Sequence, residues 1–438
     1  MWPALSRVLL YAVIIVTPTL ISAFQRPSET DAFPHELATR FGLLGFTILA
    51  MQFVVSARIK WVERPFGLDE VFRFHKAMAV FVTLLLISHP LIMAWTDPDW
   101  ALITKAHQPW IIQIGRTAIV LLIILLIISL FRIVLRFEFQ KWRLTHNIVG
   151  GIVLSLAFIH AFVQSGDLEL NTVRAMIAAL IAGGVAAYMY HMLVIPGISR
   201  RYAYTVASVK QETHNVWTLE LRPPEGMRIP EYMPGQFHFI TLFRQCGPPV
   251  EEHPFTISSS PAARGYLAST IKESGDYTST IGSTKPGDRA ALQGPFGRFS
   301  YKVRQDEHDL VFIAGGIGIT PLMSMLRFLR DTGSDVNVLL LYLNRTEKDI
   351  IFKDEIEDME SGSKPRFKVN HILSKPDEDW NGKTGFADRD KIERLVGSDV
   401  RAKSYYICGP AMMMGQVIRI LLEIGVSESR IYYERFAL

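Results

Sequence analysis

Six long apolar stretches in the first half of the chain constrain its fold more than any other feature. They cover residues 5–24, 35–57, 71–95, 110–135, 144–164 and 172–195. A helix needs about 20 apolar residues to cross the hydrocarbon core of a bilayer, and each stretch is close to that length. The sequence therefore predicts a six-helix, all-α transmembrane bundle, so that the protein is a multi-pass integral membrane protein surrounded by lipid.

The charges of the loops predict how this bundle is oriented. Up to residue 196 the sequence has 15 Lys and Arg against 11 Asp and Glu, and the remainder has 31 of each. The net charge of +4 thus comes from the membrane half, where it indicates orientation rather than binding to nucleic acid. The basic residues gather before the third stretch and between the fourth and fifth, at Arg58, Lys60, Arg64, Arg132, Arg136, Lys141 and Arg143. Because cytoplasmic loops carry such an excess, we expect both termini and the C-terminal half in the cytoplasm.

The first apolar stretch has a second interpretation. Ile21-Ser22-Ala23 resembles the small-residue cleavage site of a signal peptide, which would remove this segment from the mature protein. The five remaining stretches would keep their topology in either case.

The pattern changes at Pro196-Gly197. Short strands with Gly and Pro turns run from about 202 to 302, and strands then alternate with helices to the end. This predicts an antiparallel β-barrel followed by an α/β domain with a doubly wound parallel sheet. We place the domains at 1–197, 198–304 and 305–438. The only cysteines, Cys246 and Cys408, are too few to staple a secreted fold and suit a reducing compartment.

Four histidines occupy matched positions in the third and fifth stretches. His75 and His89 are 14 residues apart, and so are His146 and His160. Fourteen helical residues span about 21 Å and return the side chain to within about 40° of the same face. Because the two helices run in the same direction, His75 should meet His146 at an inner level and His89 should meet His160 at an outer level. Two bis-histidine sites stacked through a bilayer suit two low-spin haems.

Other roles for these histidines remain open. A single intramembrane histidine commonly bonds to a neighbouring helix or belongs to a proton path. A tetrahedral zinc site fits less well, since no Cys, Asp or Glu lies at a matching depth. The two equal spacings favour the haem interpretation.

Two motifs of the expected barrel suit a flavin. The run from His253 through Pro254, Phe255 and Thr256 to Ser258 offers an aromatic ring and hydroxyl groups to a flat heterocycle. The segment 272–278, which contains Gly275 and ends at Thr278, leads into a short helix whose amides and hydroxyl suit a pyrophosphate. Ordinary turns and caps use the same residue types.

Two further motifs follow strands of the expected α/β domain. Gly315, Gly316, Gly318, Thr320 and Pro321 lie where a buried strand opens into a helix, which lets backbone approach a dinucleotide closely. A tight structural turn would use the same glycines. Cys408-Gly409-Pro410 ends another strand at the edge where open α/β sheets bind ligands, although Cys408 also fits as a small core residue. Taken alone, Phe436, near the C-terminus, is typical of an aromatic residue in a protein core.

In their shared order, the motifs resemble those of the ferric reductase and NADPH oxidase family of transmembrane flavocytochromes b, over nearly the full chain. The C-terminal half alone resembles the ferredoxin-NADP reductase fold. The resemblance implies FAD, two b-type haems held by the four histidines, and NADPH or NADH as electron donor. A hydride brings two electrons and a haem accepts one, so the flavin converts between them.

The resemblance also implies a role for each motif residue. His253, Pro254, Phe255 and Thr256 would hold FAD, with Ser258 in the same motif and Gly275 and Thr278 at the pyrophosphate. The glycine-rich run from Gly315 to Pro321 would cradle NAD(P)H. Cys408, Gly409 and Pro410 would border the nicotinamide, and Phe436 would stack on the flavin until the nicotinamide displaces it. Thr256, Cys408 and Phe436 would thus lie nearest the reacting atoms. Arg345 matches a position that contacts the 2′-phosphate of NADPH, although a surface arginine after a strand is equally ordinary.

The electron acceptor stays open between a ferric chelate and oxygen, which would give superoxide. Oxidase members carry another histidine one turn after the outer ligand of the third span, where this sequence has Met93, and their last outer loop is longer than the segment 165–171 here. No EF-hand pattern is present. An alternative function is that of a haem-free, membrane-anchored NAD(P)H-flavin reductase that serves a partner protein.

Overall fold

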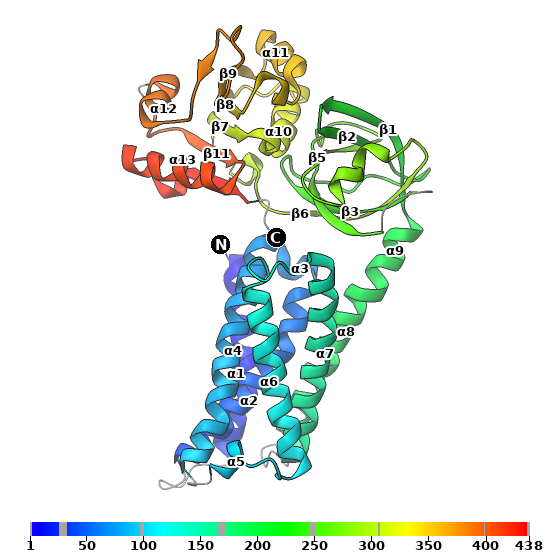
Figure 1. The fold of residues 1–438 in the computed structure, drawn as a ribbon, viewed down its shortest axis with the longest axis vertical. Coiled ribbons are helices and arrows are strands. Elements are labelled where there is room, and N and C mark those ends of the chain that lie inside the picture. Colours follow the sequence, from blue (N-terminus) through cyan, green and yellow to red (C-terminus); the bar gives the residue numbers. More distant parts are fainter. Residues whose placement is uncertain are drawn as a thin grey trace. The chain divides into compact units, whose positions relative to one another are not determined.

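The chain divides into two compact units, Met1–Ile195 and Pro196–Leu438, and each is described by itself. The computed structural model describes residues 2–25, 33–96, 100–164, 171–244, 250–304, 307–397 and 399–435 (Figure 1). Phe436 and Cys246 lie outside these ranges.

Among the described residues of the first unit, six helices are long and apolar enough to cross a membrane, as predicted. The sixth span continues from α8 through a π-helical turn into α9. Two short helices, α3 (Lys60–Glu63) and α5 (Ala101–Thr104), lie between spans. The spans are α1 (Trp2–Gln25), α2 (Phe33–Ser56), α4 (Leu68–Thr96), α6 (Trp110–Leu130), α7 (Phe139–Gln164) and α8 (Asn171–Met189), with the π-turn at Tyr190–Val194 and α9 at Ile195–Arg201.

The fourth and fifth spans differ from the sequence prediction at their shared loop. α6 ends at Leu130 instead of residue 135, and α7 begins at Phe139 instead of residue 144. The guanidinium of Arg132 lies over the rings of Phe139 and Trp142, at 5.1 and 5.5 Å from their centroids. The apolar residues from Ile133 to Leu135 therefore belong to the loop and not to the helix, and the cation–π contact of Arg132 spans that loop.

The central helix of the bundle is α2, which packs against α1, α4 and α8, while α6 packs against α7. Small residues allow these close approaches, as is usual between membrane helices. A Cβ added at Gly45 would lie 2.8 Å from the Leu86 side chain, and one added at Gly184 would lie 3.1 Å from the Ala50 carbonyl oxygen. The bundle core contains Phe46, Ile48, Leu49, Val82, Leu85, Leu122 and Val153.

The second unit begins with the predicted antiparallel barrel. Its sheet has the strand order β4-β3-β6-β1-β2-β5. The two edges meet because Ile257, just after β4, pairs with Ser269 of β5, and the Ser258 amide donates to the Ala268 carbonyl at 2.8 Å. The strands are β1 (Tyr204–Thr213), β2 (Val216–Arg222), β3 (Phe237–Phe243), β4 (Glu252–Thr256), β5 (Leu267–Lys272) and β6 (Arg289–Phe296).

The predicted doubly wound sheet follows, parallel throughout and in the order β10-β9-β8-β7-β11-β12. Helices α10 and α11 cover one face and α12 and α13 the other, each over its own apolar core. The strand order reverses between β7 and β11, and ligands of such sheets bind at the carboxyl ends beside that point. The elements are β7 (Asp309–Gly315), α10 (Ile319–Asp331), β8 (Asn337–Asn344), α11 (Lys353–Ser361), β9 (Arg366–Leu373), β10 (Lys383–Thr384), α12 (Arg389–Val396), β11 (Ser404–Cys408), α13 (Ala411–Ile424) and β12 (Ile431–Glu434).

Candidate functional site

The outer histidines of the bundle are anchored to backbone carbonyls of neighbouring helices. Nδ1 of His89, on α4, hydrogen-bonds the Ala38 carbonyl of α2 at 2.7 Å. Nδ1 of His160, on α7, hydrogen-bonds the Ile111 carbonyl of α6 at 2.9 Å. A carbonyl oxygen only accepts, so each Nδ1 carries the proton and each Nε2 keeps its lone pair. The meeting of His89 with His160 at the outer level stays a prediction.

The inner histidines face each other with their ring centroids 6.2 Å apart and their planes inclined by 62°. Nδ1 of His146 lies 3.3 Å from the Ser129 hydroxyl, which lies 2.7 Å from the Leu125 carbonyl and receives the Trp142 indole N–H at 3.2 Å. Since the hydroxyl proton goes to Leu125, the Ser129 oxygen accepts from His146, whose Nε2 therefore keeps its lone pair.

The fourth histidine, His75, lacks the Nδ1 hydrogen bond that the other three make. Its Nδ1 is buried and has no hydrogen-bond partner among the described residues. The Gln52 side chain is also buried in the bundle, and neither of its amide atoms has a hydrogen-bond partner among the described residues.

In the barrel, the predicted flavin motif forms β4 and the turn after it. The His253 ring stacks on Tyr277, with centroids 4.0 Å apart and planes 22° apart, and its Nε2 lies 2.8 Å from Glu251 Oε2. Pro254 and Phe255 are half-buried, whereas Thr256 is 5% exposed. His253 and Phe255 are thus the accessible aromatic side chains of this region, and Tyr277, which is 4% exposed, lies behind the His253 ring.

The Ser258 side chain lies in the core of the barrel. The side chain is fully buried, and its hydroxyl lies 2.9 Å from the Thr270 hydroxyl and donates to the Ala268 carbonyl at 3.2 Å. These bonds help close the barrel and leave the hydroxyl without access to a ligand. At the expected pyrophosphate segment, the Thr278 hydroxyl accepts the amides of Ser274 and Gly275 at 2.9 and 3.0 Å, so this group serves the local turn.

The glycine-rich loop after β7 packs tightly against the turn after β11. A Cβ added at Gly318 would lie 2.2 Å from the Cys408 carbonyl oxygen, and one added at Gly409 would lie 3.0 Å from the Gly315 backbone. Gly316 has a φ of +52°, a left-handed conformation that suits glycine, and open space around it. The two loops at the reversal point therefore approach as backbone, with Gly316 facing free volume.

Three other predicted residues of these loops are buried. Thr320 is 1% exposed and its hydroxyl donates to the Ile317 carbonyl at 3.0 Å; Pro321 is buried in the same helix. The Cys408 side chain is fully buried, and burial together with the Glu434 carboxylate raises the pKa of its thiol well above the usual range. None of the three presents its side chain to solvent, so thiolate chemistry at Cys408 is disfavoured.

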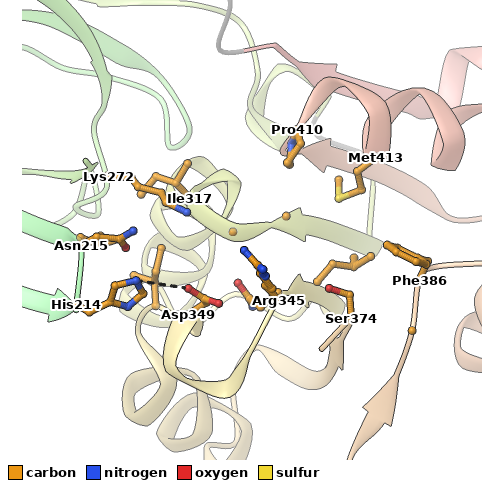
Figure 2. A pocket seen from close by; sticks show the side chains of 17 residues that line it. His214, Asn215, Lys272, Ile317, Arg345, Asp349, Ser374, Phe386, Pro410 and Met413 are labelled. Atoms are coloured by element: carbon orange, nitrogen blue, oxygen red, sulfur yellow. Dashed lines mark ion pairs between the residues drawn. The ribbon is translucent and has the colours of Figure 1, made fainter. Parts of the chain in front are cut away.

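A pocket of about 390 Å³ opens between the barrel and the carboxyl edge of the parallel sheet (Figure 2). His214, Asn215 and Lys272 come from the barrel, and His214 Nε2 lies 4.0 Å from Asp349 Oδ1. Arg345 and Phe386 lie farther along the pocket, away from the barrel residues. The residues predicted to bind NAD(P)H that line the pocket are Gly315, Gly316, Arg345 and Pro410. Lys272, from the segment 272–278 that was predicted to hold a pyrophosphate, also lines it. The lining residues missed by sequence reasoning include His214, Asn215, Ser374, Phe386 and Met413.

Sequence reasoning also missed Arg244, which follows β3. Its Nη1 donates to the Thr280 carbonyl at 2.8 Å, and its guanidinium lies 5.4 Å from the Tyr277 ring centroid. The remaining nitrogens, Nε and Nη2, are buried and have no hydrogen-bond partner among the described residues. An arginine after a strand carries no local signal of this kind, because the strand register alone brings it beside Tyr277.

Three segments of the chain match known protein families. Residues 41–159 match the ferric reductase like transmembrane component, residues 201–287 match an FAD-binding domain, and residues 312–418 match the oxidoreductase NAD-binding domain.

Individual relatives resemble only part of the chain. NADH-cytochrome b5 reductase 2 of Botryotinia fuckeliana is 26% identical over 245 residues, covering 51% of this chain and 70% of that protein. NADH-cytochrome b5 reductase 1 of Dictyostelium discoideum is 32% identical over 182 residues, covering 41% of this chain and 63% of that protein. A flavohemoglobin from Malassezia yamatoensis, solved with bound FAD and heme, has a TM-score of 0.50 and 17% identity over 83% of this chain and 97% of its own. That level of identity shows a shared fold alone.

The transmembrane match sets this chain apart from a reductase of the cytochrome b5 type, since it adds a ferric reductase-like span region to the FAD- and NAD-binding domains. This order of domains is the architecture of the ferric reductase and NADPH oxidase family, and the chain is an integral membrane NAD(P)H oxidoreductase of that architecture, which transfers electrons through FAD.

Proposed function

We propose that the chain carries electrons from cytoplasmic NAD(P)H through FAD and two b-type haems to an acceptor on the opposite face of the membrane. The observation that carries this proposal is the protonation pattern of the bundle histidines. Three of the four have Nδ1 bonded to an acceptor, which leaves Nε2 as a lone-pair donor. Metal-bound histidines have this arrangement almost without exception.

The spacing of the histidine rings supports the same proposal. A metal–nitrogen bond to imidazole is about 2.0–2.1 Å, so an iron between two facing rings holds them several ångströms apart. The inner rings, at 6.2 Å between centroids, leave room for one such atom. No Cys-x-x-Cys-His occurs in the sequence, which favours non-covalent, b-type haem. When bound, FAD would split the electron pair of a hydride into single electrons, which each haem carries one at a time.

FAD is assigned to the accessible aromatic part of the barrel. Phe255 and His253, whose ring is backed by the buried Tyr277, offer flat surfaces to the flavin and its nucleotide half. The two unpaired nitrogens of Arg244 supply a charged contact for the pyrophosphate beside Tyr277. Arg244 thus places a positive charge beside the flavin motif of the barrel.

The pocket at the strand reversal is assigned to NAD(P)H. Gly315 and Gly316 let the dinucleotide approach the backbone, and Pro410 lies across from them where we place the nicotinamide. Arg345, with Ser374 beside it in the pocket, is assigned to the 2′-phosphate, and Phe386, 68% exposed, to the adenine. Phe436 remains our proposed flavin shield, and it lies outside the described residues.

The first experiment asks whether the haems exist. Protein purified from a haem-supplied host should show a b-type spectrum and two haems per chain in a pyridine haemochrome assay, together with one FAD. A folded, FAD-loaded protein without haem would refute the proposal and leave the membrane-anchored flavin reductase as the function.

The second experiment separates the acceptors. NAD(P)H oxidation by the purified protein in lipid vesicles is measured with a ferric chelate or with oxygen as acceptor, each with and without superoxide dismutase. A ferric reductase reduces the chelate under nitrogen at an undiminished rate. An oxidase needs oxygen and releases superoxide. Reduction of added cytochrome c reports the superoxide, and superoxide dismutase abolishes that reduction.

A further inference from the structure

The outer histidines share a feature that the inner ones lack: each ring lies against a glycine of the neighbouring helix. A Cβ added at Gly42 of α2 would lie 3.1, 3.3 and 3.4 Å from Nδ1, Cε1 and Cγ of His89. A Cβ added at Gly115 of α6 would lie 2.7, 2.8 and 3.0 Å from the same three atoms of His160. The same ring edge therefore meets a glycine in both places, on two different pairs of helices.

The hydrogen bonds repeat as well. His89 bonds the carbonyl of Ala38, and His160 bonds the carbonyl of Ile111. Each carbonyl lies four residues before the glycine, so it is the one that accepts the glycine's own N–H in an α-helix. The carbonyl has two lone pairs and can serve both donors, provided that the imidazole comes close enough. A side chain at the glycine position would occupy the place where the imidazole lies.

We propose that Gly42 and Gly115 are positioning residues, which we call the glycine seats, and that they hold the outer histidines with Nδ1 protonated and Nε2 free for one shared iron. This inference rests on the proposed function, because it concerns how the chain prepares the outer of two haem sites. The described glycines of the bundle make no corresponding contact with His75 or His146. The two sites are therefore built differently within one pair of helices, α4 and α7.

The seats also have an electronic consequence. A hydrogen bond from Nδ1 to a carbonyl raises the basicity of the imidazole and so stabilises the oxidised iron. Both outer ligands have this bond at 2.7 and 2.9 Å, whereas His146 has a longer one to a hydroxyl and His75 has none of normal geometry. By ligand donation, the outer centre would therefore have the lower midpoint potential of the two.

The test replaces each seat by alanine in the full chain. Because the Gly115 contact is the tighter, Gly115→Ala should weaken retention of the outer haem by about 10–100-fold, the usual effect of losing an outer-shell partner of a metal ligand. Gly42→Ala should keep more of the outer haem and raise its midpoint potential. The matched controls are Gly151→Ala on α7 and Gly183→Ala on α8, where an added Cβ meets nothing within 4 Å.

The readouts are the haem-to-protein ratio, the low-spin ferric EPR signals and a spectroelectrochemical titration, with FAD content as a check on folding. His160→Ala and His146→Ala identify the outer and inner signals. Selective loss or shift of the outer signal supports the proposed role of the glycine seats in positioning the outer histidines. An unchanged outer signal in Gly115→Ala overturns the inference, and so does equal loss of both signals or the same loss in the controls. Absence of haem from the wild type is a different outcome, because it refutes the proposed function itself.

Discussion

The membrane unit and the reductase unit prepare their candidate cofactor sites in opposite ways. In the bundle, the site is a set of imidazoles in the middle of helices, and Nδ1 of each outer one is bonded to the backbone of another helix. In the reductase unit, the pocket is formed by turns after strands, where glycine backbone approaches glycine backbone. A bundle site therefore depends on single side chains, whereas the nucleotide site depends on how two loops fit together.

The largest expected effect comes from removing one bundle side chain. His160→Ala leaves the outer site with one imidazole, so the outer haem should be lost and transfer to the far face should stop. FAD content and NAD(P)H-dependent flavin reduction should persist, because they belong to the other unit. The haem assay measures haem content, and stopped-flow absorbance measures NAD(P)H-dependent flavin reduction. If His160→Ala retained two haems, the bundle site would not depend on single side chains, and the contrast with the nucleotide site would fail.

The next effect tests the fit of the two loops. Gly318→Ala should force the loop after β7 away from the Cys408 carbonyl, because the added Cβ would lie 2.2 Å from that oxygen. Overpacking of this kind costs about 1–3 kcal/mol, and the NAD(P)H pocket beside it should open. Thermal unfolding and NAD(P)H affinity should both decline while haem content stays the same. Gly415→Ala, on α13 with nothing near its Cβ, is the control and should be neutral or stabilising.

A third effect concerns how the stability of the barrel depends on pH, which we expect only for the reductase unit. Full burial lowers the pKa of His238 to about 3, and its Nε2 lies 2.7 Å from the Ser269 hydroxyl. In the unfolded chain the histidine pKa is about 6.5, so between about pH 3 and 6.5 the unfolded chain binds a proton at His238 and the folded barrel does not. Stability should therefore be complete above pH 6.5 and fall by about 1.4 kcal/mol per pH unit below it, until about pH 3.

The measurement is the release of FAD on heating the full chain at pH 7, 6 and 5. His238→Gln removes the titrating group and should flatten the dependence, while His308→Gln, at an exposed histidine, should leave it as in the wild type. Equal pH dependence in all three proteins would assign the acid sensitivity to other groups.

The smallest effect concerns one charge at the rim of the pocket. Arg345→Ala should raise the KM for NADPH by roughly tenfold and leave that for NADH nearly unchanged, because a charge-assisted contact of about 1.4 kcal/mol is lost only with the phosphorylated cofactor. Arg366→Ala, an arginine of β9 that pairs with Asp335, serves as control. Equal changes for both cofactors would return Arg345 to the role of an ordinary surface residue.

The parts predicted correctly from sequence are those set by local pattern. Hydropathy located six spans, and the equal spacing of the histidines predicted that His75 would meet His146, which the ring contact confirms. The strand and turn signals predicted the barrel and the doubly wound sheet. These features depend on periodicity, which a single chain displays in full.

The parts that sequence did not reveal depend on which residues tertiary packing brings together. Ser258 belongs to a flavin-like motif, yet barrel closure takes its hydroxyl into the core. Arg132 lies just beyond the end of α6, and its ring partners, Phe139 and Trp142, lie on the next helix. Arg244 becomes a candidate ligand only through its place beside Tyr277. Each of these outcomes requires knowledge of a contact between separate elements.

The acceptor of each outer imidazole proton is main chain, and this limits how the protein can evolve. No exchange of the side chain at position 38 or 111 can delete a carbonyl, so, apart from the histidines themselves, the outer hydrogen bonds are open to mutation through the glycines beside them. The inner bond of His146 ends on the hydroxyl of Ser129, which one codon change removes. A single side-chain exchange can therefore remove the inner hydrogen bond, whereas the outer ones persist as long as the two histidines and the two glycines are kept.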